Sequence, residues 1–375
     1  MELDAEQRAI RETVREVAEE EIRPVAAEAD REQRFPEEVW DTLAELGMTA
    51  MTVPEEYGGL DLDTVSYSIV NEELAYGALA ISTALSVHGL ATSCIAQFGD
   101  KSIKSEWLPD MAEGRPVGAF ALSEPDAGSN PAEMTTEARP DGDEYVINGK
   151  KQWITNGERS EVVILFAKTD RSDPDTVTQF LVPKDVSGLT VGKKEDKMGL
   201  RASDTTSLLL DDVRIPAKYR LTAVGRGLSA ALEILNGGRI GVASQAVGLA
   251  QAAFDDAKTY AQDREQFGEP IAEKQAVRHM LAEMRTDIAA ARELTREAAR
   301  RADAGEEYRE FASIAKYFAT EAAVSVAEDA VQLHGGYGYT KDFDVERYYR
   351  DAKVTTIYEG TSQIQKDIIA RQLLG

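Results

Sequence analysis

Residues 237–251 read GGRIGVASQAVGLAQ and open a long run of apolar side chains spaced three and four positions apart. The run comprises Ile240, Ala243, Val247, Ala250, Phe254 and Ala257, and a second run of the same kind comprises Val277, Leu281, Met284, Ile288 and Ala291. This spacing places the side chains of each run on one face of an α-helix. Long helices with continuous apolar stripes are typical of a bundle core, so we expect a helical bundle here.

Upstream of this region the pattern changes to that of strands. Short runs rich in β-branched and aromatic residues are bounded by turn residues: EYVI, KKQWIT, VVILFAK, TQFLVP and TSLLL. Asn148-Gly149, between the first two runs, predicts a two-residue β-hairpin. Before the strands, apolar residues again recur at helical spacing. The expected fold is α+β and mainly α, with an N-terminal helical domain (1–115), a middle β domain (116–225) and a C-terminal helical bundle domain (226–375).

Composition limits the classes of partner. The chain of 375 residues carries a formal net charge of -25, which would repel nucleic acid and anionic membranes, so we expect neither as a partner. The N-terminal stretch is charged and predicts no signal peptide, and the single Cys94 fits a reducing compartment, so a cytoplasmic location is expected. One hypothesis for the acid excess is solvation in a salt-rich cytoplasm.

Several common cofactor and metal motifs are missing. The sequence has no G-x-G-x-x-G after a strand, no P-loop, no H-E-x-x-H and no C-x-x-C. His88, His279 and His334 stand far apart, so no metal site is expected. Any redox cofactor must be held in another way.

The segment IYEGTSQIQ, residues 357–365, holds the most informative carboxylate. Ser362 and Gln365 have the spacing of a capping box that opens the last helix, which leaves Glu359 in the turn just before it. Glu359 can then be a surface carboxylate near a helix N-terminus. Alternatively it is a general base, which requires a pocket dry enough to raise its pKa.

Four other segments admit both a structural and a functional interpretation. FALSEPDAGSN (120–130) is an ordinary turn or a cradle for polar cofactor groups. KKQWITNG (150–157) places Trp153 and Thr155 on one strand face, where the tryptophan is a core residue or covers a flat ring. QLHGGYGY (332–339) and DREQFG (263–268) end helices, as caps or as ligand contacts.

In their order and spacing, these segments together with KMGLRASDT and YRDAKVTTIYEGTSQIQ resemble the acyl-CoA dehydrogenase family over essentially the whole chain. The resemblance implies non-covalently bound FAD. It implies that Leu122 and Ser123 contact the flavin ring, Ser129 the phosphates, and Trp153 and Thr155 the ring face. The remaining cofactor contacts that it implies, partly to the FAD of a neighbouring subunit, are Arg264, Phe267, Gln275, Gln332, Gly336, Thr361 and Gln363.

The same resemblance implies a reaction. Glu359 would take the α-proton of a fatty acyl-CoA while the β-hydrogen leaves as hydride to the flavin, and the product would be a trans-2-enoyl-CoA. Some family members carry the base on the helix expected to begin near Gly238-Arg239, where this chain has glycine. The implied substrate contacts are Ser129, Asn236, Arg239, Tyr358 and Gly360.

The resemblance also implies partners. They are an acyl-CoA substrate, an electron-transfer flavoprotein as electron acceptor, and further copies of the chain in a homo-oligomer, usually a tetramer. Two alternatives remain: an acyl-CoA oxidase, and a catalytically inactive helical binding protein on the same fold. Short or medium straight acyl chains are favoured over branched ones, but the sequence leaves chain length open.

Overall fold

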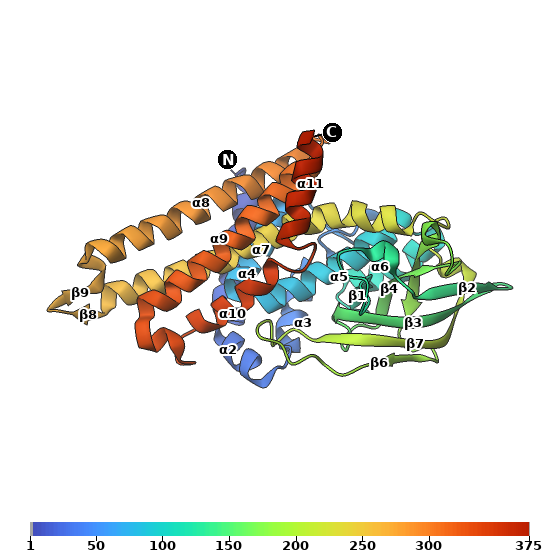
Figure 1. The fold of residues 1–375 in the computed structure, drawn as a ribbon, viewed down its shortest axis with the longest axis horizontal. Coiled ribbons are helices and arrows are strands. Elements are labelled where there is room, and N and C mark those ends of the chain that lie inside the picture. Colours follow the sequence, from blue (N-terminus) through green and yellow to red (C-terminus); the bar gives the residue numbers. More distant parts are fainter. Residues whose placement is uncertain (1–2, 375) are drawn as a thin grey trace.

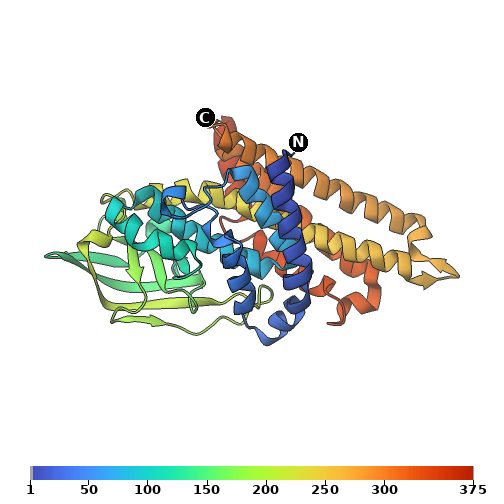
Figure 2. The same cartoon turned by 180° about the vertical axis from the view of Figure 1, so that it is seen from behind.

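The computed structural model describes residues 3–374, and its helices and strands follow the expected order (Figure 1). The first part is helical, with α1 (Ala5–Val17), a π-helical turn (Ala18–Ile22), α2 (Arg23–Glu32), α3 (Glu37–Glu45), α4 (Thr64–Gly77), α5 (Leu79–Phe98) and α6 (Lys101–Ala112). Asp4 starts α1 through a capping box with Gln7, whereas Asp63 and Asp100 cap α4 and α6 through a single side-chain hydrogen bond each. Seen from behind, α1 crosses the middle of the molecule (Figure 2).

Helix α5 is the one described helix whose length and composition would allow it to cross a membrane. Its most apolar stretch of 18 residues has a mean hydropathy of 1.5, and 83% of this stretch is buried inside the protein. It packs against β1 and the neighbouring helices α4 and α7. A core helix surrounded by other elements has this composition too.

The middle part is a seven-stranded sheet. Its strands are β1 (Gly118–Ala121), β2 (Glu137–Asp141), β3 (Glu144–Thr155), β4 (Val162–Lys168), β5 (Val177–Pro183), β6 (Leu189–Val191) and β7 (Thr205–Pro216). The order is β1-β4-β2-β3-β7-β6, with β5 on β4. Strands β1 and β4 are parallel, and β3 pairs with β2 and β7 in antiparallel fashion.

The hairpin predicted at Asn148-Gly149 is wrong. Both residues lie inside the continuous strand β3, at a register shift against β7. There Asn148 Nδ2 donates to Asp212 Oδ1 and the backbone N–H of Asp212 donates to Asn148 Oδ1, each at 2.9 Å. The hairpin turn instead lies at Gly142, between β2 and β3. An Asn-Gly pair suits a β-bulge as well as a turn, because both need unusual backbone angles, and only the pairing with β7 distinguishes them.

The last part is the bundle. It contains α7 (Gly227–Asp263), the small hairpin β8 (Glu265–Gln266) and β9 (Glu269–Pro270), α8 (Gln275–Asp303), α9 (Arg309–His334), the 3₁₀ segment η8 (Gly335–Tyr339), α10 (Val345–Thr355) and α11 (Ser362–Leu374). Helix α7 begins at Gly227, well before Gly238. Both predicted apolar stripes face the core, with Phe254, Val277 and Leu281 partly buried at its edge.

The glycines of residues 237–251 let helices approach each other closely. A Cβ at Gly248 would lie 1.9 Å from the carbonyl oxygen of Glu72 on α4, so only glycine fits where α4 crosses α7. Helix α7 runs from the sheet to the far tip of the bundle, where β8 and β9 protrude (Figure 1). It therefore links the two ends of the molecule.

Candidate active site

Glu359 lies in the turn between α10 and α11, with backbone in the left-handed region. Its φ is 54°, and the next residue, Gly360, has a φ of 88°. A left-handed conformation costs a non-glycine residue about 1–2 kcal/mol, so the surrounding contacts must hold it. Gln365 Nε2 donates to the carbonyl oxygens of Glu359 (3.2 Å) and Gly360 (3.0 Å), and Lys316 Nζ donates to that of Gly360 (2.8 Å).

The last helix does not begin with the predicted capping box. Thr361 caps it, because its Oγ1 accepts from the backbone N–H of Ile364 at 3.3 Å. Ser362 is the first helical residue, and its hydroxyl donates to Glu321 Oε1 at 2.6 Å instead. Since the cap lies one position earlier, Gln365 is too far along to accept from the cap N–H. Its side-chain amide donates instead to the carbonyl oxygens of Glu359 and Gly360.

The carboxyl group of Glu359 is enclosed although the residue keeps some exposure. Its Oε2 is buried and has no hydrogen-bond partner in the described chain. A Cβ at Gly238 on α7 would stand 2.7 Å from Oε2, so glycine at that position leaves space for the carboxylate. Burial raises the pKa of Glu359 to about 7, while Arg239 and Lys316 oppose the rise. A surface carboxylate would have neither property, so the structure favours the general base.

Arg239 and Asn236, both predicted substrate contacts, are buried on α7, and the charge of Arg239 is near enough to Glu359 to act on it. Arg239 Nη1 donates to Asn236 Oδ1 at 2.5 Å, and its Nε has no partner in the described chain. Burial lowers the pKa of Arg239, and Glu359 counteracts this. Tyr358 Oη donates to Gln245 Oε1 at 3.0 Å, which ties the turn to α7.

On the sheet side, a buried ion pair fixes the loop that follows β1. Lys151 Nζ lies 2.8 Å from Glu124 Oε1 and also donates to the carbonyl of Leu122 at 3.1 Å, while Gln152 N donates to that of Ser123 at 2.9 Å. Burial alone would raise the pKa of Glu124, but Lys151 and the N–H of Thr135 bring it down to about 2. Sequence reasoning missed this pair, because Lys151 stands between the polar residues Lys150 and Gln152 and so gives no local signal that it is buried.

Trp153 is not a core residue. It is 61% exposed and has a φ of 63°, at a second register shift of β3. Trp153 and Thr155 flank the buried Ile154, so burial still alternates at these positions despite the register shift. An exposed indole beside Leu122 and Ser123, which are half-buried, leaves a flat apolar surface available to a ligand ring.

Five of the predicted cofactor residues form a separate group at the bundle tip (Figure 1): Arg264, Phe267, Gln275, Gln332 and Gly336. Phe267, between β8 and β9, is 94% exposed. Arg264 and Gly336 line an open pocket of about 510 Å³, and Gln332 precedes it at the end of α9. Gln275 is the exposed first residue of α8. One chain therefore does not bring this group together with Trp153 and Glu359. Thr361 precedes α11 and Gln363 lies in its first turn, close in the chain to Glu359, while the exposed Ser129 lies in the loop after β1.

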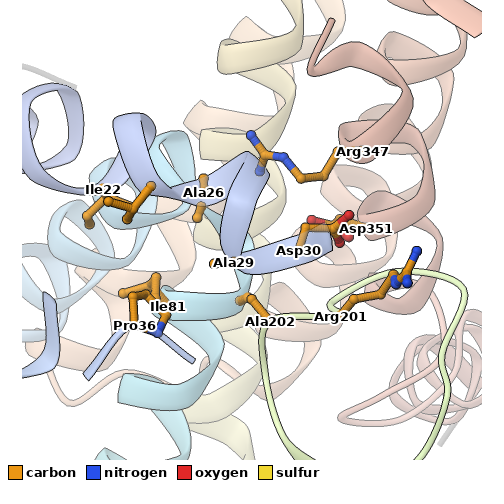
Figure 3. Close-up of a pocket in the computed structure, with 13 residues that line it drawn as sticks. Ile22, Ala26, Ala29, Asp30, Pro36, Ile81, Arg201, Ala202, Arg347 and Asp351 are labelled. Atoms are coloured by element: carbon orange, nitrogen blue, oxygen red, sulfur yellow. The ribbon is translucent and has the colours of Figure 1, made fainter. Parts of the chain in front are cut away.

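A small, nearly filled pocket is lined by residues of α2, α5 and α10 and of the loop before β7 (Figure 3). Asp351 of α10 accepts from the backbone N–H of Leu200 at 2.6 Å, and Arg350 Nη2 lies 2.7 Å from Asp30 Oδ2 of α2. Burial raises the pKa of Asp351 to about 6. These contacts join the loop before β7 and helix α2 to α10, so they place the helix that leads into Glu359.

Among residues 3–374, no group of three or more His, Cys, Asp or Glu side chains is placed to hold a metal ion. The site thus consists of a buried carboxylate without a partner, two buried cations near it, and an exposed indole on the sheet. Such a site can take a proton from a carbon acid beside a flat redox cofactor.

Sequence models of three protein domains match consecutive parts of the chain. They are the acyl-CoA dehydrogenase N-terminal domain (residues 4–115), middle domain (119–213) and C-terminal domain (225–374). The chain belongs to the acyl-CoA dehydrogenase family. A relative of this family, the mitochondrial short-chain specific acyl-CoA dehydrogenase of Bos taurus, is 44% identical over 376 residues, which cover 100% of this chain and 91% of the relative.

Solved structures of acyl-CoA dehydrogenases and associated proteins share the fold. Butyryl-CoA dehydrogenase from Megasphaera elsdenii is 38% identical with a TM-score of 0.97 over 100% of both chains. Glutaryl-CoA dehydrogenase from Mycobacterium smegmatis, in complex with FADH2, is 35% identical with a TM-score of 0.95 over 100% of this chain and 95% of that one. A chain from the structure of the electron transferring flavoprotein of Acidaminococcus fermentans is 40% identical with a TM-score of 0.98, over 100% and 99%.

The family assignment confirms the expected fold and the expected cofactor. This acyl-CoA dehydrogenase is a flavin-dependent enzyme that uses FAD, and acyl-CoA is its class of substrate. The alternative of a catalytically inactive binding protein is therefore set aside.

Proposed function

We propose that the enzyme removes hydrogen from the α and β carbons of a short straight-chain acyl-CoA and forms a trans-2-enoyl-CoA, with Glu359 as the catalytic base. The observation that supports this most is the buried Oε2 of Glu359, which has no partner in the described chain and for which Gly238 leaves space. A carboxylate in that state has a lone pair free for a proton and a pKa close to neutral pH.

The residues of the turn supply the other requirements of proton abstraction. A thioester α-proton is weakly acidic, so the developing enolate oxygen needs a hydrogen-bond donor at the moment of transfer. In the proposal the backbone N–H of Glu359 donates to that oxygen, and Tyr358 and Gly360 line the thioester. Gln245 accepts a hydrogen bond from the Tyr358 hydroxyl, and Gln365 and Lys316 donate to the carbonyl of Gly360. The donor is therefore positioned before the substrate arrives.

We assign the cofactor contacts to two groups on different subunits. Leu122, Ser123, Ser129, Trp153 and Thr155 bind one FAD from the sheet side, together with Thr361 and Gln363. Arg264, Phe267, Gln275, Gln332 and Gly336 reach the FAD of a neighbouring copy in a homotetramer. The bound FAD supplies the hydride acceptor. The distance between the two groups within one chain supports this division (Figure 1).

Short acyl chains are proposed because bulky side chains stand near the base. A Cβ at Gly241 on α7 would lie 2.7 Å from Tyr67 Oη, and one at Gly238 would lie 3.5 Å from Leu90 Cδ2. The short-chain and butyryl-CoA specificities of the relatives support the same choice. Assays with butyryl-, octanoyl- and isobutyryl-CoA test it, and the highest kcat/KM is expected for butyryl-CoA.

The proposed electron acceptor is an electron-transfer flavoprotein, and an acyl-CoA oxidase is the alternative. Anaerobic addition of butyryl-CoA should bleach the yellow holoenzyme and yield trans-2-butenoyl-CoA. The bleached enzyme should then reduce an electron-transfer flavoprotein much faster than it forms hydrogen peroxide in air. Rapid peroxide formation would support the oxidase, and absence of bleaching by any acyl-CoA would contradict the proposed reaction.

A further inference from the structure

Lys316 of α9 is fully buried, with its side chain directed at the turn that carries Glu359. Its Nζ donates to the carbonyl oxygen of Gly360 at 2.8 Å. Lysine is rarely buried without a close carboxylate, because an ammonium group loses much hydration free energy inside a protein. Here the hydrogen bond goes to a backbone carbonyl, and burial lowers the pKa of Lys316 to about 8. Such a costly arrangement indicates a role beyond packing.

We propose that Lys316 is a positioning residue for the catalytic base: its hydrogen bond holds the left-handed Glu359–Gly360 turn, and its charge favours the carboxylate form of Glu359. This inference rests on the proposed function, in which Glu359 takes the α-proton. Lys316 itself does not touch the substrate in this account.

The hydrogen bond matters because the turn contains two successive residues with positive φ, 54° and 88°. The carbonyl of Gly360 accepts from both Lys316 and Gln365, and that of Glu359 accepts from Gln365 alone. Gln365 is neutral, so it can hold the backbone but cannot change the charge near the carboxylate. Both donors therefore hold the backbone of the turn, but only Lys316 also changes the electrostatic potential at the carboxylate.

The charge matters because few ionisable groups face Glu359. Arg239 comes from α7, Lys316 from α9 and Tyr67 from α4, and Tyr358 precedes it in the turn. Burial raises the pKa of both tyrosines, so they stay neutral near pH 7. The two cations thus supply the positive charge that opposes the desolvation of the carboxylate.

The surroundings of Lys316 are equally sparse. Glu359 and Glu321 stabilise its charged form, and Arg239 disfavours it. Glu321 accepts a hydrogen bond from the hydroxyl of Ser362 in the first turn of α11. Lys316 thus lies between the base and the start of the last helix, and it can influence both.

The first test compares four variants of the FAD-loaded enzyme through the pH dependence of kcat/KM. Lys316→Met should move the acid limb, which reports ionisation of the base, upward by about one pH unit, as removal of a buried charge at an effective dielectric near 20 implies. kcat/KM near pH 6.5 should then fall about tenfold, with partial recovery above pH 8. Lys316→Arg keeps the charge and should restore the limb.

Two further variants are controls. Gln365→Leu removes the neutral donor, so it should lower kcat without moving the acid limb. Thr320→Val removes a buried hydroxyl that bonds only to backbone carbonyls of its own helix, one turn from Lys316, and should change neither. An unmoved acid limb in Lys316→Met, or an equal shift in Thr320→Val, would overturn the proposal.

The second test does not depend on turnover. Thermal unfolding of Lys316→Met, Glu359→Gln and the double variant forms a double-mutant cycle. The coupling in Tm should be measurable at pH 7.5, where both groups are charged, and should vanish at pH 5.5, where Glu359 is protonated. Coupling that is absent at both pH values would contradict the inference. Full activity of Glu359→Gln, by contrast, would contradict the proposed function. The coupling in Tm would still decide separately whether Lys316 interacts with Glu359.

Discussion

The Oε2 of Glu359 lies against Gly238, so that a Cβ on that glycine would be 2.7 Å away. Glu359 lies in the turn before α11, and Gly238 lies on the long helix α7. A side chain at 238 would displace the carboxylate into the space that the proposed reaction needs for the substrate. This contact yields the first of five predictions.

Gly238→Ala should keep the fold and lose activity. Alanine is a better helix former than glycine by about 1 kcal/mol, and the atom it would crowd is the end of a flexible side chain, so Tm should not fall. The displaced carboxylate should lower kcat with butyryl-CoA at least tenfold, in line with the effect of a misplaced base. Gly237→Ala is the control, since its Cβ would meet nothing within 4 Å. Equal activities of the two variants would argue against the contact.

Glu359→Gln should remain yellow, bind acyl-CoA and turn over at least about a hundredfold more slowly, because the amide keeps the shape but cannot accept a proton. Absorbance near 450 nm measures the bound flavin, and stopped-flow bleaching measures the chemical step. Turnover close to that of the wild type would remove Glu359 from its role.

The pH dependence follows from the raised pKa of Glu359. Below about pH 7 the carboxyl is protonated and cannot act as a base, so kcat/KM should fall on the acid side with an apparent pKa near 7. The free energy of unfolding should change in the opposite direction and fall as pH rises. The folded state binds this proton more tightly than the unfolded state between about pH 4.5 and 7, so the wild type should lose on the order of 3 kcal/mol relative to Glu359→Gln as pH rises through that window. A constant difference in Tm from pH 4.5 to 7.5 would contradict this.

Lys151→Met should destabilise the β1 loop. It leaves Glu124 charged and buried, with only its bonds to Thr135 and Thr136, and the loss of one partner of a buried pair costs about 3–5 kcal/mol. Because Lys151 also binds the carbonyl of Leu122, the variant should also retain less FAD after dialysis. Lys150→Met, at the exposed neighbouring position, should behave like the wild type.

Phe267→Ala should leave the single chain folded but weaken its assembly. The ring is 94% exposed in one chain, so its removal costs no core packing. If it reaches a neighbouring subunit, analytical ultracentrifugation should show dissociation at higher protein concentration, and FAD affinity should fall about tenfold, the expected scale for an aromatic anchor. Leu46→Ala, which removes another exposed apolar side chain, is the control. Unchanged assembly and FAD content would place Phe267 outside the interface.

Periodicity along the chain was sufficient for the order of helices and strands, since apolar stripes on α7 and α8 and the β-rich runs report local geometry. A capping signal near Ser362 was sufficient to place Glu359 in a turn before the last helix. Such local signals failed where two local structures share one signature: Asn148-Gly149 forms a bulge instead of a hairpin, and Thr361 caps α11 instead of Ser362.

Only packing between distant segments decided the chemistry of the site. The burial of the Glu359 carboxylate depends on α7, the hydrogen bond to Gly360 on α9, and the placement of Leu122 on Lys151 in another strand. A pKa depends on which charges and how much water surround a group, and these are set by residues remote in the chain. For that reason the sequence could name the carboxylate, while its protonation behaviour and the part played by Lys316 emerged only from the folded protein.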